Sequence, residues 1–185
     1  MTTSSSKCAK YTEYVKTILY IHHGWGLGGA PLSLLRLVQG LDPCKYRPVI
    51  ICLQNGEAVQ MFRSMNIETH VYKGIRSFNH TTAAWYPLYH PFKIAQLAQE
   101  FAHFFSSAGL TEALIRKYQP ALVHLNSLTT VPSALGTKRA GIPLVWHVRE
   151  AAHPGHFGMR LRLLRHWLYN WPDEIIYICK DNQER

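Results

Sequence analysis

A glycine-rich loop between an apolar segment and an amphipathic segment is the feature of this sequence best suited to chemistry. Four glycines fall within six residues, at Gly24, Gly26, Gly28 and Gly29, and Pro31 follows them. Such a loop lets backbone N–H groups approach a ligand at the positive end of the next helix, which suits a phosphate or diphosphate. We expect Gly28 and Gly29 either to allow close backbone approach or to adopt positive φ. The alternative is a flexible strand-to-helix turn without a ligand.

The same loop also satisfies the spacing GxGxxG, which is typical of dinucleotide-binding domains. Those domains carry an acidic residue near the end of their second strand, whereas this chain has Leu53, Gln54 and Asn55 there, and Glu57 comes too late. An NAD(P)-dependent oxidoreductase, or a non-catalytic nucleotide- or sugar-binding module, remains an alternative function.

Histidines are the other candidate ligands. His22 and His23 are adjacent, and His147, His153 and His156 follow one another closely. No cysteine or carboxylate completes a recognisable zinc-ligand spacing among them, and the sequence has no GxSxG or Cys/His nucleophile arrangement. We therefore expect no metal and no cofactor.

The elements that must position these residues alternate between strands and helices. Apolar runs predict strands, and apolar residues at three- and four-residue spacing predict helices. The predicted strands cover residues 16–22, 48–53, 67–72, 121–125, 142–148 and 174–179. The predicted helices cover residues 31–41, 57–65, 94–105, 111–118, 131–140 and 157–171. This alternation predicts an α/β, Rossmann-like fold with a doubly wound parallel sheet, which binds ligands at the carboxyl ends of its strands.

Composition narrows the class of protein and of partner. The 185 residues suit one domain over 16–185, after a Ser/Thr/Lys-rich leader over 1–15. A net charge of +9 favours an anionic partner, but no nucleic-acid-binding motif accompanies it. We expect the scattered Cys8, Cys44, Cys52 and Cys179 to be reduced thiols. Without a signal peptide or an apolar run of about 20 residues, a cytoplasmic protein is expected, either soluble or peripheral at the inner membrane face.

The predicted helix over 157–171 combines an apolar stripe with a basic face. The stripe comprises Phe157, Leu161, Leu164, Leu168 and Trp171. The arginines of this helix are Arg160, Arg162 and Arg165. One interpretation is a helix that covers the sheet and turns a solvated basic face outward. The other is that these arginines face an anionic membrane surface.

Several segments together resemble the N-terminal domain of family 4 glycosyltransferases, the retaining class with the GT-B fold. They are residues 28–35 (GGAPLSLL), 123–127 (VHLNS), 141–150 (GIPLVWHVRE) and 173–179 (DEIIYIC). The resemblance covers nearly the whole chain in the right order. It implies transfer of a sugar from a nucleotide sugar to a glycan or a lipid-linked acceptor.

In that family the N-terminal domain holds most of the acceptor site, and a second Rossmann-like domain binds most of the nucleotide sugar. The present sequence contains no second domain with the family's paired-glutamate motif. We therefore expect the chain to be inactive alone, as a fragment or as one subunit beside a separate C-terminal domain.

The resemblance also assigns roles to individual residues. It implies that Gly28 and Gly29 approach the donor diphosphate, and that His147 is the catalytic residue beside the transferred sugar. It implies contacts with the sugar or acceptor for four further residues, namely Asn126, Ser127, Arg149 and Glu150.

Overall fold

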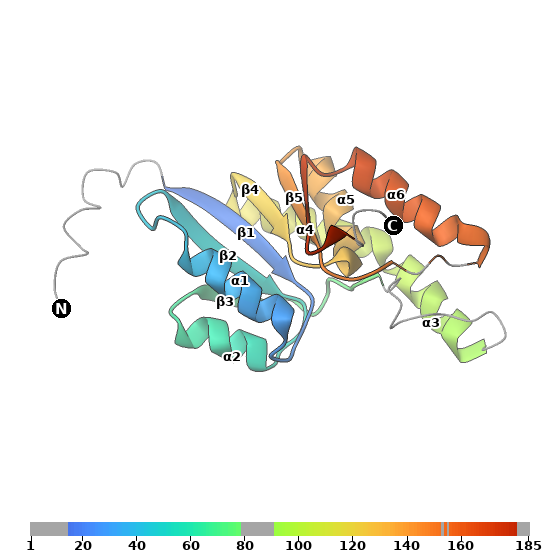
Figure 1. The fold of residues 1–185 in the computed structure, drawn as a ribbon, viewed down its shortest axis with the longest axis horizontal. Coiled ribbons are helices and arrows are strands. Elements are labelled where there is room, and N and C mark those ends of the chain that lie inside the picture. Colours follow the sequence, from blue (N-terminus) through green and yellow to red (C-terminus); the bar gives the residue numbers. More distant parts are fainter. Residues whose placement is uncertain (1–14, 79–90, 153, 155, 181–185) are drawn as a thin grey trace.

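The computed structural model describes residues 15–78, 91–152, 154 and 156–180. Its centre is one sheet of six parallel strands in the order β3-β2-β1-β4-β5-β6, which confirms the predicted doubly wound α/β fold (Figure 1). The strands are β1 (Lys16–His22), β2 (Tyr46–Cys52), β3 (Glu68–Val71), β4 (Leu122–Leu125), β5 (Leu144–Val148) and β6 (Glu174–Tyr177).

Helices cover both faces of this sheet. The helices are α1 (Gly29–Gln39), α2 (Glu57–Ser64), α3 (Pro91–Ala102), α4 (Phe104–Tyr118), α5 (Val131–Ala140) and α6 (Met159–Asn170), with short 3₁₀ helices η3 (Leu128–Thr130) and η4 (His156–Gly158). Successive side chains of a strand point to opposite faces. Accordingly, Tyr20 and Ile50 pack with α1 and α2 in one core, whereas Leu19 and Ile21 pack with α4, α5 and α6 in the other.

Strands β1, β2 and β4 end at the same level of the sheet. His22, the last residue of β1, pairs with Cys52 of β2, and Ile21 pairs with Leu125 of β4. One further hydrogen bond, from the Asn126 N–H to the Ile21 carbonyl at 3.0 Å, continues the ladder. The loops after β1, β2 and β4 therefore leave the sheet side by side.

Helices α1 and α6 begin at other residues than predicted, as do α3, at Pro91 rather than residue 94, and α4. Helix α1 begins at Gly29 rather than Pro31, because Pro31 is tolerated anywhere in the first turn, where its missing N–H costs no helical hydrogen bond. Helix α6 begins at Met159 rather than residue 157, because Phe157 (φ 53°) and Gly158 (φ 70°) adopt left-handed backbone. The Phe157 side chain is 90% exposed, so it does not belong to the apolar stripe.

The helical region between β3 and β4 also divides differently from the prediction. Helix α3 ends at Ala102, and α4 runs without interruption from Phe104 to Tyr118. Phe104 therefore starts α4 and is buried there, rather than ending the preceding helix.

The cysteines differ from the expectation of four reduced thiols. Cys52 and Cys179 are free, but Cys44 is disulfide-bonded, so the expectation is wrong for Cys44. The predicted leader up to residue 14, Cys8 and His153 lie outside the described residues. Among the described helices, none combines the length and apolar character needed to cross a membrane.

Candidate functional site

The glycine-rich loop between β1 and α1 lines a hollow of about 580 Å³ at the carboxyl end of the sheet. Residues 22–31 and Gln54 surround it. The loop is fixed to the neighbouring α2, because the Ala58 N–H donates to the Trp25 carbonyl at 3.1 Å. Gly56 allows this approach, since a Cβ there would collide with the Trp25 backbone.

The two glycines assigned to a diphosphate stand where a ligand has room. Gly28 is the N-cap of α1 with an extended backbone, φ −126° and ψ −172°. A Cβ built on Gly28 or Gly29 would meet no atom within 4 Å, and neither glycine has positive φ. Of the two alternatives, positive φ is therefore excluded, and what these glycines provide is open space beside the backbone. The first N–H groups of α1 have no partner within the helix and carry its positive dipole end.

A row of polar side chains lies on the α1 side of the sheet, and one of them, His22, lines this hollow. The same alternation is found at the ends of three strands. The pairs are Tyr20 and His22 on β1, His124 on β4 with Asn126 directly after that strand, and His147 on β5 with Arg149 directly after that strand. The His124 ring lies between Tyr20 and His147, at centroid distances of 5.1 Å and 5.7 Å. Sequence reasoning missed His124 and treated His22 only as a possible metal ligand. The signal available in the sequence was a polar side chain at every second position near the end of three strands, which places these side chains on one face of the sheet.

Arg149 and Asn126 connect this row. The Arg149 Nε donates to Asn126 Oδ1 at 2.9 Å, and its Nη2 donates to Ser33 Oγ of α1 at 3.1 Å and to His147 Nδ1 at 3.2 Å. The Asn126 Nδ2 donates to the Ala30 carbonyl at 3.2 Å and lies 3.1 Å from His22 Nδ1. One guanidinium and one amide thus tie β1, β4, β5 and the start of α1 together.

Burial determines the charges in this row. It lowers the pKa of His22 to about 3, with the charges of His23 and Arg149 adding to the effect. It lowers the pKa of His124 to about 4, aided by His147 and Arg149, and that of His147 to about 4, aided by Arg149. All three rings are therefore neutral at pH 7. Burial also lowers the pKa of Arg149, whereas the neighbouring Glu150 carboxylate acts in the opposite direction.

Ser127 and Glu150 form a second cluster on the other side of the same loops. Ser127 caps η3 by accepting from the Thr129 N–H at 3.0 Å, and its hydroxyl donates to Glu150 Oε1 at 2.6 Å. The second carboxylate oxygen of Glu150 accepts from the Leu128 N–H at 2.8 Å, and His23 lies 3.7 Å from Oε1. Glu150 thereby joins the loops that follow β1, β4 and β5.

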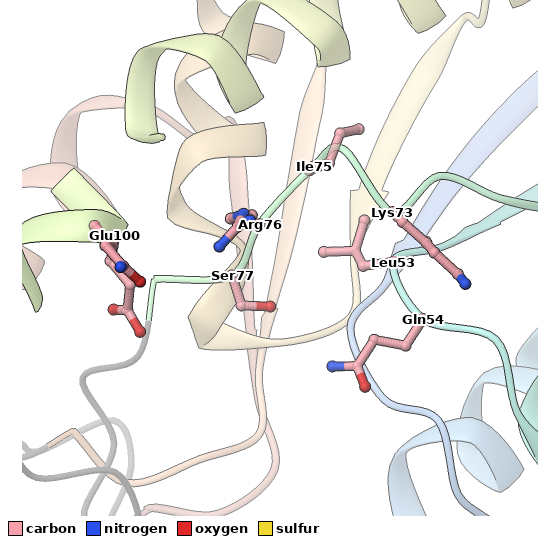
Figure 2. Close-up of a pocket in the computed structure, with 8 residues that line it drawn as sticks. Leu53, Gln54, Lys73, Ile75, Arg76, Ser77 and Glu100 are labelled. Atoms are coloured by element: carbon pink, nitrogen blue, oxygen red, sulfur yellow. The ribbon is translucent and has the colours of Figure 1, made fainter. Parts of the chain in front are cut away.

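A second hollow of about 340 Å³ adjoins the first. Its lining includes Lys73, Arg76 and Ser77 from the segment after β3, Gln99 and Glu100 from α3, and Leu53 and Gln54 after β2 (Figure 2). Gln54 lines both hollows, so the two are neighbours at this edge of the sheet. Figure 2 shows Gln54 and Ser77 presenting polar groups toward the space between them.

The structure gathers most of the predicted site residues. Gly28, Gly29, Asn126, Ser127, His147, Arg149 and Glu150 all lie at the carboxyl ends of β1, β4 and β5 or in the loops that follow. Asn126 and Ser127 are fully buried, so they organise the site from within. The three arginines of α6 belong to another part of the fold. Arg162 and Arg165 are exposed there, and Arg160 is half-buried.

Comparison with known proteins agrees with this arrangement. Residues 28–185 match the family described as glycosyl transferase 4-like domain, and the chain belongs to that family. No curated protein sequence is similar enough to match.

Solved structures share the fold at low sequence identity. HepE (Alr3699) of Anabaena, solved with UDP and glucose, has a TM-score of 0.60 and 17% identity over 91% of this chain and 40% of its own. MurG of Acinetobacter baumannii has a TM-score of 0.56 and 14% identity over 88% and 41%. A UDP-N-acetylglucosamine 2-epimerase has a TM-score of 0.57 and 13% identity over 92% and 44%. The chain thus spans about 40% of the length of HepE and corresponds to one Rossmann-like half.

Proposed function

We propose that this chain is the N-terminal, acceptor-side half of a retaining glycosyltransferase. It would act with a C-terminal domain that binds most of the nucleotide sugar and transfer the sugar to a glycan or a lipid-linked acceptor. The hollow beneath the glycine-rich loop carries this proposal, because it combines open space at Gly28 and Gly29 with the N-terminus of α1. The complex of HepE with UDP and glucose supports it, since HepE shares the fold.

Each part of the site has a role in this proposal. The N–H groups at the start of α1 would bind the donor diphosphate, and their dipole would stabilise its negative charge without a side-chain cation. His147, neutral at pH 7, would donate a hydrogen bond to a sugar oxygen. Because burial keeps His147 uncharged, it would orient the sugar rather than balance the charge of the leaving group.

The second hollow is the proposed acceptor site. Its lining offers amide, hydroxyl, ammonium, guanidinium and carboxylate groups within one space. Such a mixture suits the many hydroxyl groups of a glycan. Its position beside the first hollow, across Gln54, would bring the acceptor next to the transferred sugar.

A membrane-associated acceptor is the second part of the proposal. Arg162 and Arg165 are exposed on α6, and the apolar side chains of Phe157 and Met159 next to them are 90% and 63% exposed. Basic and apolar side chains together favour binding to an anionic lipid surface. This surface would hold the protein at the face of the membrane where a lipid-linked acceptor is located.

Donor turnover by the chain, alone and with a donor-binding C-terminal domain, tests the proposal. We expect no transfer by the chain alone and transfer by the combination. Gly29→Val places a branched side chain into the open space and should reduce kcat/KM for the donor at least tenfold, a loss of about 1.4 kcal/mol of transition-state stabilisation.

Gly109→Val is the matched control for this substitution. Gly109 also lies in a helix, and a Cβ there meets nothing within 4 Å, but it lines neither hollow. It should retain the activity of the parent. Transfer by the chain alone, or equal activity of Gly29→Val and the parent, would overturn the proposal.

A further inference from the structure

The hydrogen bonds around Arg149 determine which nitrogen of each neighbouring histidine carries a proton. A guanidinium has only donors. Arg149 Nη2 lies 3.2 Å from His147 Nδ1, so this nitrogen must accept. Because His147 is neutral at pH 7, its one ring proton is then on Nε2.

The same reasoning reaches His22 through Asn126. Arg149 Nε donates to the oxygen of the Asn126 amide, Oδ1, which fixes the orientation of this amide and leaves Nδ2 as the group facing His22. The bond from Nδ2 to the Ala30 carbonyl confirms this orientation, since a carbonyl only accepts. Asn126 therefore donates to His22 Nδ1, and the ring proton of neutral His22 is also on Nε2.

The Nε2–H of His22 faces the glycine-rich loop. His22 is fully buried, and among the described residues its Nε2 has no hydrogen-bond partner. A Cβ built on Gly24 would lie 3.2 Å from this nitrogen, so the backbone of Gly24 covers it. His22 also lines the hollow. A buried donor without a partner is costly, and a ligand oxygen that reaches it by displacing the Gly24 backbone would remove that cost.

We propose that Arg149 is a positioning residue that holds His147 directly, and His22 through Asn126, in the tautomer with the proton on Nε2. Both rings then present a hydrogen-bond donor, and neither has a free lone pair with which to remove a proton. His22, which lines the hollow, thus favours ligands that offer oxygen acceptors, such as phosphate oxygens or sugar hydroxyl groups. This ligand class rests on the proposed function, whereas the tautomers themselves do not.

Two-bond ¹H–¹⁵N correlation spectra of the histidine rings, recorded on the unliganded chain at pH 7, measure the tautomers directly. We expect His22 and His147 each to show a protonated Nε2 and an unprotonated Nδ1. The His22→Phe and His147→Phe variants assign the signals. A proton on Nδ1 of either ring in the parent would overturn the inference.

Two substitutions separate positioning from a general structural role. Arg149→Met removes the donor and should give His147 a mixture of tautomers, and Arg36→Met, an exposed arginine of α1, should leave it unchanged. In Asn126→Asp the group facing His22 can only accept, so a proton should appear on His22 Nδ1 while His147 keeps its tautomer.

The two variants Arg149→Met and Asn126→Asp keep the inference testable if one of them does not fold. Asn126→Asp keeps a partner for Arg149, so it remains informative if Arg149→Met does not fold. An unchanged His147 tautomer in folded Arg149→Met, or an unchanged His22 tautomer in folded Asn126→Asp, would refute the role of Arg149. The spectra are recorded without nucleotide or acceptor, so this result would not contradict the proposed sugar transfer. Equal activity of Gly29→Val and the parent would, in turn, not contradict the tautomers.

Discussion

Acidification is expected to destabilise this protein well before its carboxylates are protonated. Burial lowers the pKa of His22 to about 3 and those of His124 and His147 to about 4, whereas all three have the ordinary value of 6.5 in the unfolded chain. Between these values the unfolded chain binds protons that the folded chain does not. The stability is therefore fully present above pH 6.5 and is lost as the pH falls toward 4.

The size of the effect follows from the number of buried rings. Each histidine that is protonated only in the unfolded chain costs about 1.4 kcal/mol at pH 5.5, one unit below its unfolded pKa. Three independent rings give a loss of about 4 kcal/mol, a large share of the roughly 5–15 kcal/mol typical of a domain. This is an upper value, because each ring contributes its full share only if it binds no proton in the folded chain at pH 5.5.

Urea unfolding at pH 7.5, 6.5 and 5.5 measures the loss. His124→Phe keeps an aromatic ring between Tyr20 and His147 but cannot bind a proton, so it should reduce the loss at pH 5.5 by about 1 kcal/mol. His166→Phe is the control, because His166 is exposed on α6. A parent whose free energy of unfolding changes by less than about 1 kcal/mol between pH 7.5 and 5.5 would refute the assignment of these histidines as buried and neutral.

Three further outcomes are expected. Gly136→Val should lower the free energy of unfolding by about 1–3 kcal/mol. The reason is that a Cβ there would lie 2.8 Å from the Thr111 Cβ, where α5 packs on α4. An unchanged free energy in urea unfolding would show that this contact relaxes freely. Ser127→Ala should cost about 1–2 kcal/mol by removing the η3 cap, and an unchanged melting temperature would exclude that role. The double variant Arg162→Glu/Arg165→Glu should co-sediment at least tenfold less with anionic vesicles at low salt, because each arginine near the surface contributes about 1 kcal/mol. Equal sedimentation would reject the membrane surface.

Local patterns in the sequence determined the elements and their order. The apolar run before His22, the glycines after it and the apolar spacing from Leu32 onward specify strand, loop and helix through neighbouring residues alone. Parallel strands separated by helices then require a doubly wound sheet, and its carboxyl edge is where the loops gather. That is why the sequence alone could place Gly28 and Gly29 at this edge, whereas the role of His147 came from the resemblance to family 4 glycosyltransferases.

Only the tertiary structure decided which side chains meet across the sheet. Asn126 looked like a cleft residue, but the strand order places it between His22 and Arg149, fully buried. Local sequence cannot give this result, because the contact between His22 and Asn126 joins residues 104 positions apart and depends on strand order and level. The same limit explains Phe157, whose helical spacing predicted burial, since the left-handed backbone before α6 turned it outward. Periodicity encodes which face of its own element a residue occupies, whereas its partner depends on how distant elements pack.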